Sequence, residues 1–129
     1  MGRSTQELAN LDRVIIMYQE VLIAMNPDAV DDHLPPHYVQ HSSLAEPGLE
    51  ALKQFLAKVR IKSPDARQTI HRAMADGDLV MVHVHIERWP GDTGLAVADI
   101  FRCENGEIVE HWDVVQSLPT HPVNSNSMF

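Results

Sequence analysis

The sequence has little of several features that mark particular classes of protein. Its one cysteine, Cys103, excludes an intrachain disulfide and a zinc site built from thiolates. Its continuous apolar runs are a few residues long, far short of the roughly 20 residues that span a membrane. The polar first ten residues contain no apolar signal-peptide core. We therefore expect a cytoplasmic protein without a membrane partner.

Basic residues are also scarce. The chain has 10 Lys and Arg against 18 Asp and Glu, a formal net charge of -8, and the basic residues form no run. Such a chain repels phosphate backbones and anionic lipids, so we expect no nucleic-acid partner. The sequence contains no Gly-x-Ser-x-Gly, phosphate-loop or dinucleotide motif.

The composition is that of a small globular protein. The 129 residues suffice for one hydrophobic core, and 44% of them are apolar. We expect one domain over residues 1–129. The tail from about residue 119 carries two prolines and is expected to form an arm on the surface or on a partner subunit.

Apolar residues in the first half recur at helical spacing. Over residues 7–25 they fall three or four positions apart, which predicts an amphipathic helix. Asn26 and Pro27 favour the start of a short second helix, which ends near His33 before two prolines. A third helix is predicted over residues 48–60.

The second half alternates between apolar and polar residues, which is typical of strands. After a brief extended segment at 38–41, strands are predicted over residues 67–75, 79–89, 95–103 and 107–118. Tight turns are expected at 76–78 and 104–106. The order predicts an α+β fold in which three N-terminal helices pack on one face of a curved antiparallel sheet. Such a fold encloses a pocket suited to a small hydrophobic molecule.

Asp99 is the one acidic residue inside the strand 95–103. If Arg102 faces solvent, alternation turns Asp99 and Phe101 inward. In the next strand His111 and Asp113 share a face with Val109, and Ile108 and Trp112 lie on the other.

The hairpin at Asn105-Gly106 allows two registers. A two-residue turn places Asp99 opposite Trp112, and a type I turn with Gly106 as a bulge places it opposite His111. We prefer the bulged form, because it sets Phe101 against Val109. It brings a carboxylate and an imidazole within about 5 Å at their side-chain roots.

The residues Asp99, His111 and Asp113 are therefore the candidate catalytic residues. A carboxylate against an imidazole holds a transferable proton, and a second carboxylate nearby separates the pKa values into acid and base roles. The alternative is a satisfied polar network without chemistry.

Two further histidine sites bear on the pocket. His83 and His85 share a strand face with Glu87, and a His-x-His pair can bind a metal with Glu87 or His41 as a third ligand. We expect no metal site, since three N-terminal helices do not suit an all-β metal barrel. His83 is instead a candidate substrate-binding residue of the pocket. His41 either points into the pocket mouth or caps the following loop.

Two aromatic residues complete the predicted substrate-binding set. Tyr18 lies on the apolar face of the first helix, with its hydroxyl at the pocket rim, and Phe101 faces inward beside Asp99. The opposite sheet face is too apolar to be left in water, because it carries Ala96, Ala98, Ile100, Trp112 and Val114. We therefore predict a homodimer that packs through the sheet.

Several segments together resemble a known family. They are Tyr38-Val39-Gln40-His41, Gly48 with its helix, Ala75-Asp76-Gly77-Asp78-Leu79-Val80, Val82-His83, Ala98-Asp99-Ile100-Phe101-Arg102, Asn105-Gly106-Glu107-Ile108-Val109-Glu110-His111-Trp112-Asp113 and Met128-Phe129. From about Leu8 to Phe129 the chain resembles the SnoaL-like polyketide cyclases of the nuclear transport factor 2-like superfamily. The Glu-His-Trp-Asp segment is the most specific part.

The resemblance implies a cone-shaped α+β fold, a hydrophobic pocket and frequent dimers. In the characterised cyclases it implies cofactor-free aldol closure with an aspartate as acid and base. That role is carried to Asp99 first and Asp113 second, with His111 as partner. Ser42 and Ser43 depart from the Asn-Pro common in relatives. Because the superfamily also contains binding domains, an acid/base enzyme and a non-catalytic binding protein remain alternatives.

Overall fold

A computed structural model describes residues 2–129 of the chain. Helix α1 (Thr5–Met17) begins at a capping box, in which the Ser4 hydroxyl accepts from the Glu7 amide at 3.1 Å and the Glu7 carboxylate accepts from the Ser4 amide at 2.8 Å. The helix continues as a π-helix, η1 (Tyr18–Ile23), so the predicted helix is confirmed with a change of winding in its last turns. Such changes are frequent at functional sites.

The remaining helices follow the prediction. The Asn26 side chain accepts from the Asp28 amide at 3.1 Å and caps η2 (Pro27–Ala29), which continues into α2 (Val30–His33). Helix α3 (Leu49–Lys62) is the third. In the part of the chain that the structure describes, no helix is both long and apolar enough to cross a bilayer.

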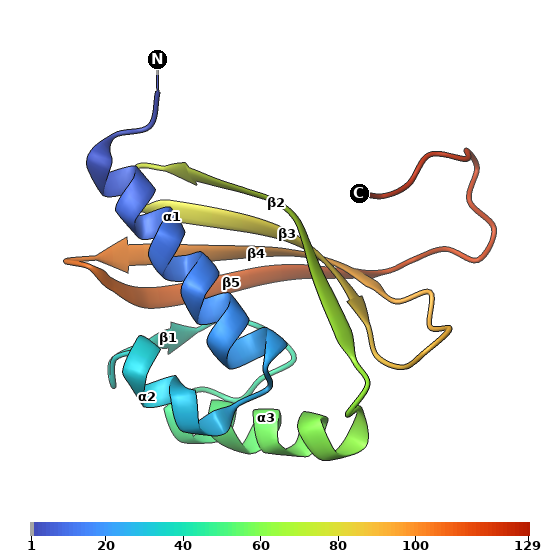
Figure 1. The fold of residues 1–129 in the computed structure, drawn as a ribbon, viewed down its shortest axis with the longest axis horizontal. Coiled ribbons are helices and arrows are strands. Elements are labelled where there is room, and N and C mark those ends of the chain that lie inside the picture. Colours follow the sequence, from blue (N-terminus) through green and yellow to red (C-terminus); the bar gives the residue numbers. More distant parts are fainter. Residues whose placement is uncertain (1) are drawn as a thin grey trace.

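The strands form one five-stranded sheet. They are β1 (Val39–Gln40), β2 (Arg67–Asp76), β3 (Leu79–Glu87), β4 (Leu95–Glu104) and β5 (Glu107–Ser117), and their order is β1-β5-β4-β3-β2 (Figure 1). Strands β2 to β5 make an antiparallel meander. The two-residue β1 pairs in parallel with β5, which brings a segment from between the helices to the edge of the sheet.

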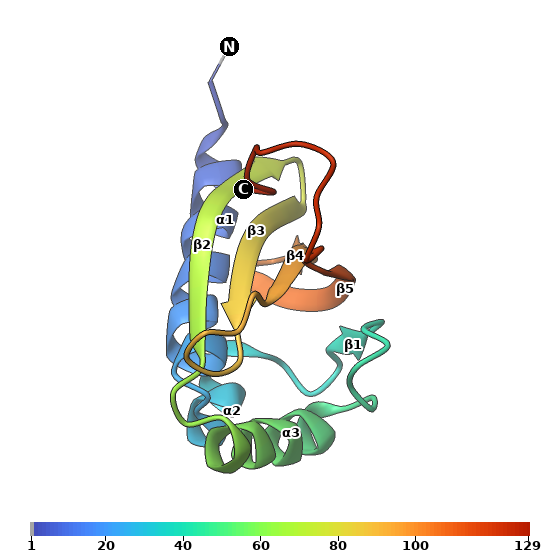
Figure 2. The same cartoon turned by 90° about the vertical axis from the view of Figure 1, so that its right-hand side faces the viewer.

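The helices lie on one face of the curved sheet, as predicted. Figure 2 shows α1 running along the sheet while α2 and α3 close its lower end. The core between the layers contains fully buried side chains of both, among them Val14, Met17, Tyr18, Val80, Val82, Val84, Phe101 and Ile108. The structure therefore confirms the α+β architecture.

Neither predicted register of the β4–β5 hairpin is correct. The two-residue turn is present, with Asn105 and Gly106 both at positive φ (52° and 79°), as a type I′ turn requires. The pairing then shifts between Arg102 and Cys103, because Val109 is an extra residue in β5. The shift puts Asp99 opposite Asp113 and Phe101 opposite His111. It also turns Ile108 into the core, where the prediction had placed it outside.

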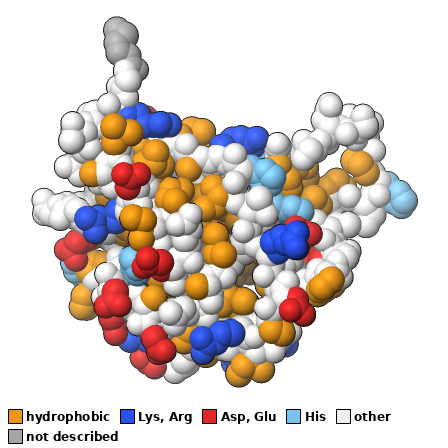
Figure 3. All heavy atoms as spheres, in the orientation of Figure 1, with side chains coloured by type: hydrophobic (Ala, Val, Ile, Leu, Met, Phe, Trp, Pro, Cys, Tyr) orange, Lys and Arg blue, Asp and Glu red, His pale blue; other side chains and the backbone are white. Residues whose placement is uncertain are grey.

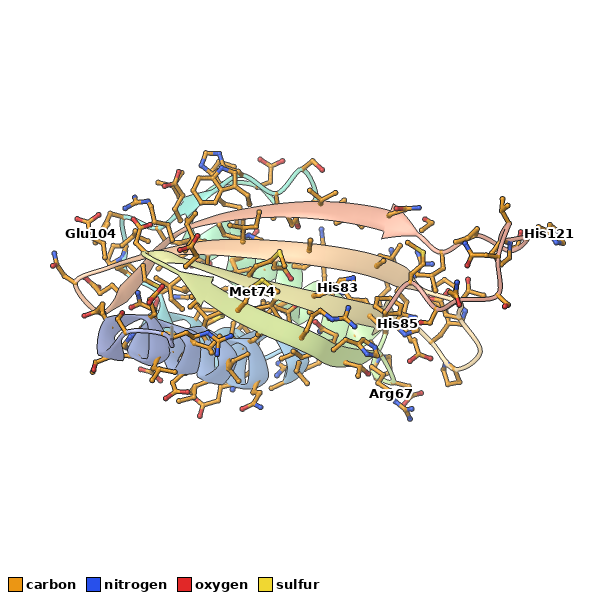
Figure 4. All side chains as sticks on the ribbon, turned by 90° about the horizontal axis from the view of Figure 1, so that it is seen from above. Arg67, Met74, His83, His85, Glu104 and His121 are labelled. Carbon is orange, nitrogen blue, oxygen red and sulfur yellow. The ribbon has the colours of Figure 1, made fainter. Side chains whose placement is uncertain are left out.

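The outer face of β2 and β3 holds a histidine cluster and the end of the chain. His71, His83 and His85 surround the ring of Phe129, whose centroid lies 4.6 Å from that of His71 and of His85. Arg72 Nη2 donates to the Phe129 carbonyl oxygen at 3.0 Å. Residues 119–128 are exposed, and Figure 4 shows His121 at the far tip of this arm and His83 and His85 on β3.

The surface in the orientation of Figure 1 is of mixed charge. Figure 3 shows basic side chains lying apart from one another, with acidic and apolar side chains between them. No basic stripe crosses this face, in agreement with the scattered basic residues of the sequence.

Candidate functional site

A cavity of about 310 Å³ lies between the concave face of the sheet and the helices. Its walls are mostly apolar and include Leu22, Met25, Leu52, Phe55, Leu56 and Val97. One group of polar side chains in the lining is joined by hydrogen bonds, and we call it the polar end: Tyr18, Gln40, Ser42, Asp99, His111 and Asp113. Ser63, Gln68 and Arg88 are further polar residues of the lining. This contrast between an apolar body and a few convergent polar groups is typical of ligand sites.

Asp99 is the most buried acidic side chain of the polar end, with 4% of its surface exposed. Tyr18 Oη donates to its Oδ2 at 2.7 Å, and His111 Nε2 lies 2.8 Å from its Oδ1. The predicted contact between Asp99 and His111 is thus present, although the two residues are diagonal neighbours across the ladder rather than directly opposed.

Gln40 determines which His111 nitrogen carries a hydrogen. The Gln40 Oε1 atom accepts from the Ser42 backbone N–H at 3.0 Å, and a backbone N–H can only donate, which identifies this atom as the oxygen. The same oxygen lies 2.6 Å from His111 Nδ1. Nδ1 therefore bears a hydrogen that it donates to Gln40.

This assignment fixes the proton count of the Asp99–His111 pair. A hydrogen bond between His111 Nε2 and Asp99 Oδ1 needs one proton between two atoms that would otherwise both accept. The proton belongs either to an imidazolium or to a neutral Asp99 carboxyl. In both cases the pair holds one proton that can be transferred, which is the requirement for acid/base chemistry.

Asp113 faces Asp99 across the ladder. Ser42, which is 8% exposed, donates through its Oγ to Asp113 Oδ2 at 2.7 Å. One potential ligand atom from each of Asp99, His111 and Asp113 lies within 4.8 Å of the others, the only such group within residues 2–129. A cation bound to His111 would have to break one of its hydrogen bonds, because Nε2 is bonded to Asp99 and Nδ1 to Gln40.

Two tyrosines support the polar end. Burial raises the pKa of Tyr18 well above its usual range, and the Asp99 charge raises it further. Burial also raises the pKa of Tyr38, whose Oη accepts from Gln40 Nε2 at 3.4 Å. Both hydroxyls therefore keep their protons at neutral pH, and Tyr18 remains a donor to Asp99.

Of the four predicted substrate-binding residues, Tyr18 lines the cavity and Phe101 does not. Phe101 is 1% exposed and lies behind His111, with ring centroids 4.6 Å apart. Its place is in the core, where it supports the imidazole.

The two predicted pocket histidines lie outside. His41 Nε2 pairs with Glu110 at 2.7 Å, and its ring stacks on Trp112. Since successive residues of a strand alternate, Gln40 takes the inward position of β1 and His41 the outward one. His83 bonds to Arg72 on the outer face, because the valines on either side of it occupy the inner face of β3.

Gln40 and Ser42 were not among the predicted site residues. In the sequence, Ser42 stands out only as a departure from the family pattern. Gln40 reaches His111 through the parallel pairing of β1 with β5, in which Gln40 and His111 are partners. A two-residue strand leaves no periodic signal from which this pairing could be predicted.

Gln40→Met should remove the hydrogen bond that fixes the His111 ring in its Nδ1–H tautomer. The Nδ1–H would lose its acceptor in a buried site, so we expect a loss of about 1–3 kcal/mol in unfolding free energy and a mixture of ring tautomers. The ¹⁵N chemical shifts of His111 at neutral pH measure the tautomer. Gln68→Met, which changes a cavity residue that contacts Leu22 instead, is the matched control. An unchanged Nδ1–H form in Gln40→Met contradicts the assignment.

The family model of the SnoaL-like domain matches residues 15–111. No match was found among the curated proteins. Among solved structures, one from Jannaschia sp. CCS1, assigned to the SnoaL-like polyketide cyclases, has a TM-score of 0.73 at 18% identity, over 89% of this chain and 90% of that one.

Two further structures share the fold. An NTF2-like protein of unknown function from Mesorhizobium loti has a TM-score of 0.72 at 15% identity, over 90% of this chain and 98% of that one. TsrD from Streptomyces laurentii has a TM-score of 0.63 at 20% identity, over 88% and 91%. At these identities the likeness concerns the fold, and it confirms the predicted architecture.

Proposed function

The chain belongs to the SnoaL-like domain family, and from this premise we propose that it is a cofactor-independent acid/base enzyme acting on a small hydrophobic carbonyl compound. One observation carries the proposal. A buried aspartate oxygen and a histidine nitrogen lie 2.8 Å apart, at hydrogen-bond distance, at the polar end of a mostly apolar cavity. In a low-dielectric cavity such a pair can take a proton from a weak carbon acid and return it.

The proposed reaction begins at a carbon next to a carbonyl group. Asp99 takes the proton, and the electron pair of the broken C–H bond forms the enolate. His111 holds Asp99 in place and delivers the shared proton to the enolate oxygen. Asp113 is the second candidate base. His83 has no part in this reaction, because it lies on the outer face.

The fate of the enolate decides the reaction class. Closure onto a second carbonyl of the same molecule is an aldol cyclisation, and reprotonation at another carbon is an isomerisation. The similarity to a structure assigned to the polyketide cyclases supports the first. Both begin with the same proton transfer, so one assay tests both.

A second candidate is a non-catalytic binding protein of the same fold. One observation favours it: within residues 2–129, no fully buried side-chain nitrogen or oxygen lacks a hydrogen-bond partner. A network satisfied in this way can also serve only to orient a bound molecule.

Exchange of carbon-bound hydrogen distinguishes the two candidates. An enolising enzyme should accelerate the loss of the α-proton signal of 2-tetralone and related ketones in D₂O, followed by ¹H NMR. A binding protein should shift the ligand signals without exchange. No exchange across the ketone panel, together with a ligand that co-purifies unaltered, would decide for the binding protein.

We further propose that the outer sheet face forms a homodimer interface. Val114 on this face has 66% of its surface exposed, and Trp112 beside it is only partly covered. Light scattering should give twice the 14.5 kDa chain mass, and Val114→Glu should give the monomer because it buries a charge in the interface. A monomeric wild-type protein at about 100 µM contradicts this proposal.

A further inference from the structure

The hydrogen-bond donors of the polar end are already engaged. Tyr18 donates its hydroxyl hydrogen to Asp99, and Ser42 donates its own to Asp113. His111 donates the Nδ1 hydrogen to Gln40. The Gln40 amide nitrogen donates one N–H to the hydroxyl oxygen of Tyr38 at the long distance of 3.4 Å. Apart from the hydroxyl of Tyr38, which does not line the cavity, the second N–H of Gln40 is the only side-chain donor left uncommitted among these residues.

An acceptor, in contrast, remains available. Ser42 occupies Asp113 Oδ2, and no residue within 2–129 donates to Asp113 Oδ1. Because no fully buried side-chain oxygen in this range lacks a partner, Oδ1 must border open space. Asp113 lines the cavity, so its free oxygen is accessible from there.

The net charge of the polar end also disfavours an anionic ligand group. Besides the Nδ1 hydrogen, the carboxyl groups of Asp99 and Asp113 and the imidazole of His111 hold one proton among them. Their total charge is therefore -1, whichever of these groups carries that proton. Arg88 is the only Lys or Arg in the described lining, and Asp92 occupies its Nε and Nη2 atoms. An anionic group at the polar end would therefore be repelled without compensation.

We propose that the polar end recognises a neutral hydroxyl group, an enol, phenol or alcohol, whose hydrogen is donated to Asp113 Oδ1. A hydroxyl finds a carboxylate acceptor here and forms a charge-assisted hydrogen bond. A plain ketone or ether, which only accepts, finds at most one uncommitted amide N–H. The preferred ligand is a hydroxyl-bearing apolar molecule, and a 1,3-dicarbonyl compound would bind as its enol.

This inference rests on the proposed function in taking the cavity as the ligand site, but it concerns recognition and not turnover. Among carbonyl compounds, the polar end would favour those that carry a hydroxyl group or enolise readily. The cavity volume lies at the low end of the range of roughly 300–1,000 Å³ for ligand pockets, so small ring systems are suitable probes.

Calorimetric titration with four naphthalenes tests the preference. At pH 7, 2-naphthol offers a neutral hydroxyl, 2-methoxynaphthalene offers only an acceptor, 2-naphthoate is an anion, and naphthalene has no polar group. We expect 2-naphthol to bind the wild-type protein about tenfold more tightly than 2-methoxynaphthalene or naphthalene, since hydrogen bonds to charged groups are among the strong ones. The anion should bind most weakly.

Asp113→Asn should abolish the preference, because the amide replaces a charged acceptor with a group that also donates. We expect the ratio to fall below about threefold. Asp12→Asn makes the same change at an exposed position of α1 and should keep the ratio. If Asp113→Asn does not fold, Ser42→Ala still tests the proposal. It frees Asp113 Oδ2 and should keep or strengthen the preference for 2-naphthol.

Three results would overturn the inference: equal or tighter binding of 2-methoxynaphthalene, no measurable binding of 2-naphthol at millimolar concentration, or an unchanged ratio in Asp113→Asn. The outcome is separable from that of the exchange assay. A preference for the hydroxyl without α-proton exchange would contradict the proposed enzyme and support the proposed hydroxyl recognition. Exchange without the preference would support the enzyme and contradict the hydroxyl recognition.

Discussion

Replacing Asp99 or His111 by alanine should lower α-proton exchange of 2-tetralone at least ~100-fold, the usual contribution of a general acid or base. Asp99→Ala removes the carboxylate that lies against His111 and leaves only Asp113, the second candidate base. In His111→Ala the proton shared with Asp99 is gone. Because the two residues act as one pair, the double variant should lose little more than either single one.

Stability must be separated from chemistry in this experiment. Asp99→Ala leaves Tyr18 Oη and His111 Nε2 without their partner, and unpaired buried polar groups cost about 1–3 kcal/mol each. Asp99→Asn keeps the volume and offers one oxygen and one amide. It should fold better and still lose the exchange activity.

Asp12→Asn, on the exposed side of α1, controls for the change in net charge. Rates within twofold of wild type in both Asp99→Asn and His111→Ala would remove the proposed chemistry. A loss confined to Asp113→Asn would transfer the base role to Asp113, the second candidate.

The helices and strands could be predicted because their patterns are local. The apolar residues of 7–25 keep helical spacing. The Asn26 side chain caps the next helix, and Pro27 occupies its first turn. Alternation in the second half identified the strands to within two residues at their ends, and β5 is one example. These elements depend on neighbours in sequence, which a single sequence contains.

The hairpin register could not be predicted, because a bulge has no local signature here. Ile108 and Val109 are both apolar, so either can face the core. Between the bulge and the far ends of the strands, the observed register differs from the predicted one by two residues, and a shift of two preserves the face of each side chain there. For this reason Asp99 and His111 meet in spite of the wrong pairing.

The positions of His83 and His41 outside the cavity have different explanations. For His83 the signal was present: Val82 and Val84 alternate with it, and apolar residues take the core face of an antiparallel strand. For His41 no signal existed, because its orientation depends on the parallel pairing of β1 with β5, about 70 residues apart. The same distant pairing supplies Gln40, the residue that sets the histidine tautomer.

Phe101→Ala should lower the unfolding free energy by about 3–5 kcal/mol, more than Phe55→Ala or Phe101→Leu, because it removes a large buried ring. Phe101 is 1% exposed, meets the Tyr18 ring edge to face at 6.4 Å and stacks on His111. The cavity left behind lies between these two partners of Asp99. Denaturation in urea, followed by circular dichroism, measures the loss.

Phe55→Ala is the matched control, since the same change at a side chain 40% exposed should cost far less. Equal losses at both positions would contradict the assignment of Phe101 to the core. Phe101→Leu should recover most of the stability because it refills most of the volume. It should not recover all of the exchange activity, since leucine has no flat face to hold the imidazole against Asp99, and a site of this kind tolerates little displacement of its proton-transfer atoms.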